Sequence, residues 1–212
     1  MTKKHIEKIT EILLTEYPNP IPALKYSTPF ELLIAVILSA QCTDERVNKV
    51  TEKLFQRAST PEEVSEMTVE ELESYIFSCG LYHSKAVHII SASKAIIENF
   101  NGEVPDTLEG LRSLDGVGRK TANVVYSVAF GGHAIAVDTH VFRVSNRLGI
   151  ADGKTPLSVE NQLMEAFPEE KWSHLHHSII FHGRRVCDAR KPNCEGCKLN
   201  EYCKFYKNKK RG

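Results

Sequence analysis

Residues 111–122, which read LRSLDGVGRKTA, decide how the middle of this chain folds. Leu111 and Leu114 have the spacing of one helix face, and a second helical pattern of small residues starts after the glycines. Gly116 and Gly118 lie between the two patterns and permit a tight turn. The segment therefore predicts two helices joined by a short hairpin.

The same hairpin has the chemistry of an anion-binding site. Glycine has no Cβ, so the backbone N–H groups around it can approach a ligand closely. The first turn of the following helix adds N–H groups without helical partners and a partial positive charge. We therefore expect Gly116, Val117, Gly118 and Arg119 to hold a phosphate. A plain helix-to-helix turn is the alternative interpretation.

Helix-start signals recur along the rest of the chain. Thr28, Thr60 and Thr68 are each followed three residues later by glutamate, which is the capping-box pattern. Apolar residues recur at helical spacing in residues 6–13 and 87–97. Residues 133–138 alternate like a strand but are too short and solitary to imply a sheet. An all-α bundle is predicted, with Gly131 and Gly132 at the junction between two lobes.

Composition indicates a globular protein with an uneven charge distribution. The longest apolar run, residues 32–38, is far shorter than the roughly 20 residues of a membrane helix. No signal peptide follows the N-terminus, so we expect a cytoplasmic protein. The chain has 27 basic and 27 acidic residues, yet residues 184–212 hold ten Lys or Arg against three acids. This basic end predicts a surface for a polyanion, and a solvated basic tail is the alternative.

Lys120 and Asp138 are predicted to come together. A helix over residues 120–130 rises about 16 Å, and the extended residues 134–138 return about 16 Å after the two glycines. Asp138 precedes a helical pattern, so an N-cap is its default interpretation. At the helix start, the dipole and partial burial of Lys120 would favour its free amine, which makes the two residues a nucleophilic pair.

This pair suggests a specific reaction. Next to a bound phosphodiester, the nearest electrophilic carbon for the amine is the anomeric carbon of deoxyribose, where attack expels the base. The resulting Schiff base makes the neighbouring hydrogen acidic, and elimination of the 3′ phosphate then breaks the strand. Asp138 would stabilise the developing positive sugar or help to deprotonate it.

Four cysteines lie within seventeen residues, at Cys187, Cys194, Cys197 and Cys203. Their C-x6-C-x2-C-x5-C spacing indicates a metal site, because disulfides are rare in cytosolic proteins. Zinc sites commonly use two short-spaced pairs, whereas only one such pair is present here. A 4Fe-4S cluster is the better fit. The loop between the first two cysteines would then present Arg190 and Lys191 to a phosphate backbone.

Together, the hairpin with Lys120, the VDTHV segment at residues 137–141 and the cysteine spacing strongly resemble the endonuclease III family. The resemblance also covers LSAQCTD at residues 38–44, GLY at 80–82 and RVSNRL at 143–148. It implies a bifunctional DNA glycosylase and AP lyase of base excision repair. The implied fold is an all-α two-lobed protein with a six-helix lobe at 22–132 and a cluster lobe made of 1–21 and 133–212.

The resemblance further implies a substrate and its contacts. The partner would be double-stranded DNA with oxidised pyrimidines or abasic sites. Apart from the resemblance, we expect a monomer by default, and binding to DNA would associate it with the nucleoid. A damaged base would flip out of the duplex, with Gln41 and Leu81 filling the space that it leaves. The family pattern also places Asp44, His140 and Arg143 at the DNA.

Two residues depart from the family pattern. Asp115 stands where proline is usual before the hairpin glycines, and an acid near a phosphate site repels unless it caps the turn or points away. His83 stands where asparagine often follows Leu-Tyr.

Other residues have plainer interpretations. His174, His176 and His177 are expected on a surface or partly buried helix face rather than at a metal. Trp172 is expected as an anchor in the core or between the lobes rather than as a platform for a base, and Tyr126 and Phe130 are expected in the core.

Three alternative functions remain open at this point. An adenine glycosylase would share the hairpin, aspartate and cluster but normally lacks the lysine. A non-catalytic DNA-binding protein would use Lys120 only as a phosphate contact. A redox protein would use the cluster for electron transfer without any need for DNA.

Overall fold

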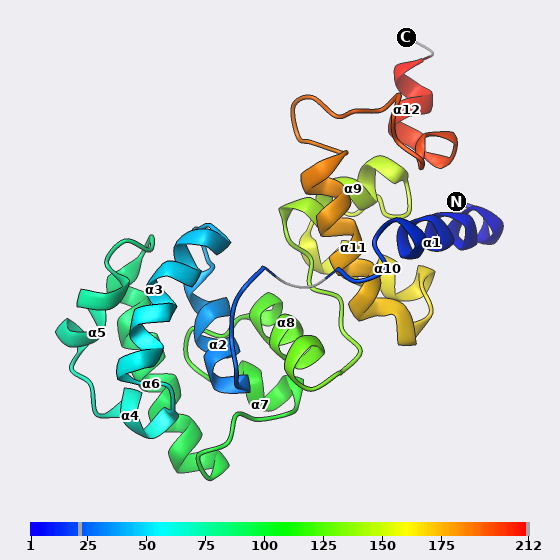
Figure 1. The fold of residues 1–212 in the computed structure, drawn as a ribbon. Helices are drawn as coiled ribbons and strands as arrows, with labels where there is room; N and C mark the ends of the chain where they lie inside the picture. The colour runs from blue at the N-terminus through cyan, green and yellow to red at the C-terminus, as the bar shows by residue number, and fades with distance from the viewer. Residues whose placement is uncertain (21–22, 211–212) are drawn as a thin grey trace. The chain divides into compact units, whose positions relative to one another are not determined.

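The computed structural model describes residues 1–20 and 23–210, and its ordered elements there are helices (Figure 1). The chain divides into two compact units, one made of residues 1–22 and 133–212 and the other of residues 23–132. The lobe boundaries expected from the sequence lie at 21/22 and 132/133, and residue 22 lies outside the described residues. Within the described part of the chain, no helix is long and apolar enough to cross a membrane.

The unit of residues 23–132 is built around one buried, largely apolar helix. Residues 30–38, nearly all of α2, are buried, which explains why this run is apolar on every side except at Glu31. Helices α4 and α5 pack on α6, and α8 packs on α2. This fully described unit has seven helices where six were expected: α2 (Pro29–Leu38), α3 (Asp44–Arg57), α4 (Pro61–Ser65), α5 (Val69–Ile76), α6 (Tyr82–Phe100), α7 (Leu108–Arg112) and α8 (Arg119–Ala129). Tyr126 and Phe130 pack against its core, as predicted.

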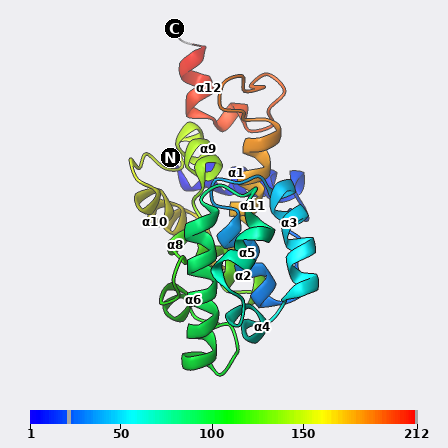
Figure 2. The ribbon, with the colours of Figure 1, turned by 90° about the vertical axis from the view of Figure 1, so that its left-hand side faces the viewer.

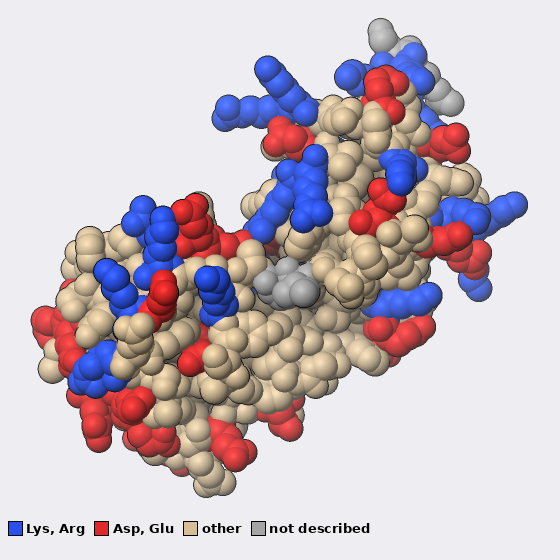
Figure 3. Space-filling view, viewed as in Figure 1, with Lys and Arg blue, Asp and Glu red and all other residues tan. Residues whose placement is uncertain are grey.

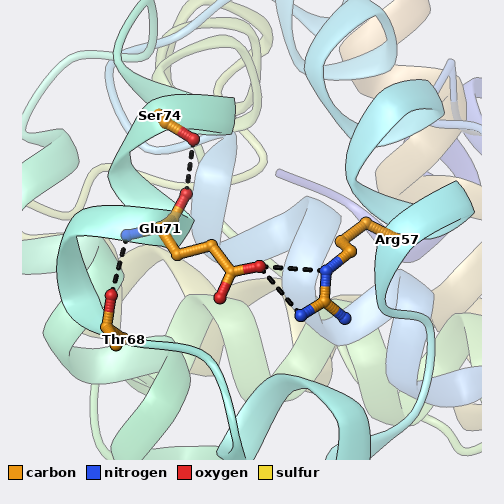
Figure 4. A network of polar contacts seen from close by, with 4 residues as sticks. All are labelled: Arg57, Thr68, Glu71 and Ser74. Carbon is orange, nitrogen blue, oxygen red and sulfur yellow. Dashed lines mark hydrogen bonds and ion pairs between the residues drawn. The ribbon is translucent and has the colours of Figure 1, made fainter.

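The threonine caps predicted from the sequence are present at Thr28, Thr60 and Thr68. Of these three caps, only that at Thr60 forms a reciprocal capping box. At Thr68, the hydroxyl accepts a hydrogen bond from the N–H of Glu71 at 3.1 Å, but the Glu71 carboxylate turns away to Arg57 (Figure 4). The Arg57 Nη2 to Glu71 Oε1 distance is 2.8 Å. An ion pair between α3 and α5 therefore replaces the second half of the predicted box.

The other unit packs its helices around α9 and α11, which lie side by side in both ribbon views (Figures 1 and 2). Trp172 is buried in its core, as expected, and its indole N–H donates to the carbonyl of Phe167 at 2.9 Å. His176 and His177 are also buried, so the expectation of a surface or partly buried face fails for them. Its helices are α1 (Lys3–Glu16), α9 (Thr139–Leu148), α10 (Pro156–Ala166), α11 (Trp172–Arg185) and α12 (Lys204–Lys209).

Candidate functional site

The hairpin between α7 and α8 has the geometry of a type II turn. The N–H of Val117 donates to the carbonyl of Leu114 at 3.1 Å, and Gly116 has a φ of +75°. A Cβ on Gly116 would lie 2.8 Å from Cβ of His88, so glycine is required both by the backbone angle and by the packing against α6. The turn is thereby held in one conformation.

The start of α8 is open to a ligand. The N-cap residue of α8 is Gly118, which supplies no side-chain cap hydrogen bond, and a Cβ added at Gly118 would meet nothing within 4 Å. The turn and this helix start therefore form an exposed cradle of backbone N–H groups, with a shape suited to a phosphate. Val117 anchors the turn in the core.

Asp115, which departs from the family pattern, is tied to the neighbouring helix. Its carboxylate accepts a hydrogen bond from the hydroxyl of Ser91 on α6. The acid thus has a hydrogen-bond partner within its own unit, a contact that the sequence analysis did not predict. Its negative charge remains on the exposed side of the turn.

Lys120 is the second residue of α8, which starts at Arg119, one residue earlier than expected, and ends at Ala129. Its side chain is exposed, so the partial burial expected from the sequence is absent. The position at the positive end of an eleven-residue helix is as predicted. Lys120 is therefore presented to solvent directly beside the phosphate cradle.

Asp138 belongs to the other unit and caps α9. Its Oδ1 accepts a hydrogen bond from the N–H of Val141 at 2.7 Å, and the side chain is half-buried. The N-cap interpretation is thus correct, and the bond from Val141 uses one oxygen of the carboxylate. Capping fixes the orientation of the carboxylate, which a catalytic role also requires.

His140 and Arg143 follow on the same helix and turn toward α11. Arg143 Nη2 lies 3.1 Å from Nδ1 of His140 and donates to the carbonyl of Gly183 at 3.0 Å. The guanidinium also donates to the carbonyl of Cys187, at 3.1 and 3.2 Å. These bonds make Arg143 a support for the end of α11 and the start of the cysteine loop.

Gln41 and Leu81 lie on two loops that touch each other. Both residues have a left-handed backbone, with φ of 53° and 61°, and the Leu81 side chain is 58% exposed. A Cβ on Gly80 would lie 3.1 Å from the carbonyl oxygen of Gln41. Two non-glycine residues in this region of backbone space are costly and are typical of functional loops. Asp44 starts α3 just after the first loop.

Lys85 is a residue of this region that the sequence analysis missed. Its side chain is buried, and Nζ donates to the carbonyls of Leu38 at 2.8 Å and Ala40 at 2.6 Å. Burial lowers the pKa of this amine. The one sequence feature that could have indicated its burial is its position on the apolar face of α6, next to Ala86 and four residues before Ile89. Lys85 anchors the Gln41 loop to α6.

The four cysteines of the C-terminal segment line one pocket. Burial, together with the charges of the other three thiols, raises the pKa of Cys197 to about 11. Burial also raises the pKa of Cys203. Four thiols around one pocket are the donor set of a four-thiolate iron-sulfur cluster. Among residues 1–20 and 23–210, no group of three His, Cys, Asp or Glu side chains would hold a single metal ion.

The loop that carries the first cysteines is ordered by its own polar contacts. Arg147 donates to the carbonyls of Asp188 and Ala189, both at 2.7 Å, and to Sγ of Cys187 at 3.4 Å. The Asp188 carboxylate accepts the N–H groups of Arg190 and Lys191, which lowers the pKa of Asp188. The side chains of those two basic residues stay exposed, as predicted.

Basic side chains gather around this loop and α12 on the face shown in Figure 3, whereas acidic side chains gather over α4 and α5. This distribution agrees with the charge asymmetry of the sequence. The loop thus offers a positive surface of the kind that binds a phosphate backbone.

Comparison with known proteins is consistent with these features. Residues 34–169 match the HhH-GPD superfamily base excision DNA repair proteins, and residues 187–203 match the iron-sulfur binding domain of endonuclease III. Endonuclease III of Haemophilus influenzae is 51% identical over 202 residues, which are 95% of both chains. The chain belongs to the endonuclease III family.

Other members of the endonuclease III family agree. Endonuclease III of Escherichia coli is 49% identical, again over 95% of both chains. A solved structure of a trapped endonuclease III–DNA covalent intermediate is 48% identical with a TM-score of 0.94, and the match covers all of both chains. The chain is accordingly a DNA glycosylase and AP lyase of base excision repair with an iron-sulfur cluster as cofactor. These relatives are named endonuclease III and match nearly the whole chain, so the adenine glycosylase alternative has no support.

Proposed function

We propose that Lys120 is the nucleophile of this glycosylase and that Asp138 is its carboxylate partner, acting on oxidised pyrimidines in double-stranded DNA. The observation that carries the proposal is the exposed lysine on the first turn of α8, beside the open N–H cradle. A relative trapped in a covalent intermediate with DNA supports a covalent route. The hairpin would bind the phosphate and bring the sugar to the amine.

The proposed reaction proceeds in balanced steps. The free amine of Lys120 bonds to C1′ as the bond from C1′ to the base breaks, and the base leaves with a proton. The C1′–O4′ bond then breaks, O4′ keeps the electron pair and takes up a proton, and the open sugar becomes a protonated imine. A general base removes a proton from C2′. The 3′ phosphate then leaves with the electrons of the C3′–O bond. Water releases the sugar fragment and restores the lysine.

Asp138 would stabilise the positive charge that develops on the sugar in the first step. It would also accept a proton from Lys120, so that the amine is free to attack. Gln41 and Leu81 would enter the space left by the flipped nucleotide, since both lie on exposed loops whose backbone is already strained. Binding of the protein to chromosomal DNA would place it at the nucleoid of the cytoplasm.

Cys187, Cys194, Cys197 and Cys203 are proposed as the four cluster ligands. When bound, the cluster cross-links these thiolates and so fixes the loop between them. Arg147 and Asp188 hold the backbone of that loop in shape, and Arg190 and Lys191 would bind phosphate from it.

Borohydride trapping on duplex DNA containing thymine glycol tests the catalytic assignment. The unmodified protein should form a covalent adduct, and Lys120→Ala should form none while it retains binding. Asp138→Asn should keep the α9 cap, because asparagine caps as well as aspartate, yet lose trapping by at least tenfold. Lys191→Ala is the matched control, which should bind more weakly but trap fully at saturating protein. An adduct that survives Lys120→Ala would overturn the proposal.

A further inference from the structure

A line of polar side chains runs from the end of α1 to the cysteine pocket. The Tyr17 hydroxyl lies 3.2 Å from Nδ1 of His182, and Nε2 of His182 lies 3.6 Å from Sγ of Cys197. Tyr17 is 9% exposed and His182 is 5% exposed. All three residues belong to one compact unit. The imidazole therefore joins a buried hydroxyl to one of the proposed cluster ligands.

The direction of these two hydrogen bonds follows from the chemistry of the sulfur. A cysteine that ligates iron is a thiolate, which can only accept a hydrogen bond. Nε2 must therefore carry the proton and donate it to Cys197. A neutral imidazole then has a bare Nδ1, which can only accept, and the hydroxyl of Tyr17 is the donor beside it.

We propose that Tyr17 and His182 form a relay that donates a hydrogen bond to the Cys197 thiolate and raises the reduction potential of the cluster. The inference rests on the proposed ligand role of Cys197. A hydrogen bond to a ligand sulfur withdraws electron density and favours the reduced cluster. Tyr17 acts as a positioning residue, because its hydroxyl selects the tautomer of His182 that can donate.

The surroundings hold the relay in place. The ring of Tyr17 contacts the rings of Phe181 and His182, with centroids 6.3 and 6.1 Å apart. One residue earlier, Glu16 pairs with Lys198 of the cysteine loop, with 2.6 Å between Oε1 and Nζ. The end of α1 is therefore fastened to the cysteine loop next to Tyr17 and packed against α11.

The relay is accompanied by a second hydrogen bond to a cysteine sulfur, which Arg147 of α9 donates. Arg147 of α9 donates to Sγ of Cys187, whereas His182 reaches Cys197 from α11. The donor from His182 lies away from water, where a hydrogen bond has a larger electrostatic effect. We therefore expect loss of the relay to have a measurable effect even with Arg147 intact.

Voltammetry of the purified holoprotein tests the relay. Tyr17→Phe should shift the reduction potential to more negative values with iron and sulfide content unchanged, and His182→Leu should shift it further. His182→Gln, which retains an N–H donor, should recover part of the shift. Tyr206→Phe is the matched control, because Tyr206 is buried, lines the same pocket and donates to Glu195 instead of a sulfur. This control should leave the potential unchanged.

A second readout identifies the proton directly. Electron-nuclear double resonance of the paramagnetic cluster should show an exchangeable proton coupling that disappears in His182→Leu. If that variant does not load the cluster, Tyr17→Phe decides the question, since it keeps the aromatic ring.

Full cluster loading in the Tyr17 and His182 variants, with an unchanged potential, would overturn the relay alone. An unmodified protein without iron and sulfide would instead overturn the ligand assignment, and the relay with it.

Discussion

At the scale of single residues, three basic side chains donate hydrogen bonds to backbone carbonyls near helix ends. Lys85 binds the carbonyls of Leu38 and Ala40 beyond α2, and Arg143 binds those of Gly183 and Cys187 at the end of α11. Arg147 does the same for the cysteine loop. The last carbonyls of a helix have no helical partner and carry partial negative charge, so a cation there stabilises the chain. These residues shape the loops that carry the proposed DNA contacts.

Lys85→Met should lower the free energy of unfolding by about 2 kcal/mol. Methionine has a similar length and fills the space, so the loss comes from two carbonyls left without their buried donor. The urea midpoint measures this loss. Lys94→Met on the same helix α6 is the control, because Lys94 is exposed and its replacement should change the midpoint little. Equal midpoints for the two variants would show that the Lys85 bonds add no stability.

At the scale of elements, the hairpin shows how a turn type sets its residue preferences. The bond from Val117 to Leu114 and the positive φ of Gly116 place Asp115 at the second position of a type II turn, where proline is favoured. The family preference for proline therefore has a conformational basis. In this chain, Asp115 instead binds Ser91, which fixes the turn through a side chain.

Asp115→Pro should bind duplex DNA severalfold more tightly than the unmodified protein. The substitution removes a negative charge beside the phosphate cradle and restricts the turn in the unfolded chain, which also contributes about 0.4–1 kcal/mol of stability. Fluorescence anisotropy with an abasic duplex measures the affinity. Asp115→Ala separates the two causes, because it removes the charge without the ring. Weaker binding by both variants would mean that the Ser91 bond outweighs the charge.

Short-range patterns were predictable at this scale, and contacts between distant helices were not. The caps at Thr28, Thr60 and Thr68 depend on residues three positions apart, so the sequence displays them. The pairing of Glu71 with Arg57 depends on how α5 packs against α3, which no local pattern encodes. The cysteine site could be predicted from the spacing of the four cysteines. The contact between Tyr17 and His182 could not, because the two residues are 165 positions apart in the sequence.

At the scale of the whole molecule, the two units have separate cores and different ionisable interiors. The buried histidines of the described chain, His176, His177 and His182, all lie in the unit of residues 1–22 and 133–212. In the unit of residues 23–132, His83 and His88 are exposed. The two units should therefore respond differently to acid.

Mild acid should destabilise the histidine-bearing unit first. Burial lowers the pKa of His176 well below its usual value and also lowers that of His177. Above about pH 6.5 both residues are neutral in the folded and unfolded states, so they have no effect. As the pH falls below that value, the unfolded chain binds protons that the folded unit cannot, and stability falls with pH. Each unit of pKa depression costs about 1.4 kcal/mol.

Trp172, the only tryptophan, lies in that unit and reports its unfolding by fluorescence. Its urea midpoint should fall between pH 7 and pH 5, while the circular dichroism of the whole chain separates into two transitions. Cluster absorbance, recorded in the same samples, separates loss of the cofactor from titration of the histidines. His177→Gln should weaken the pH dependence, and His83→Gln, at an exposed position, should leave it unchanged. A tryptophan midpoint that stays constant from pH 7 to pH 5 with the cluster intact would show that the buried histidines do not control the stability of this unit.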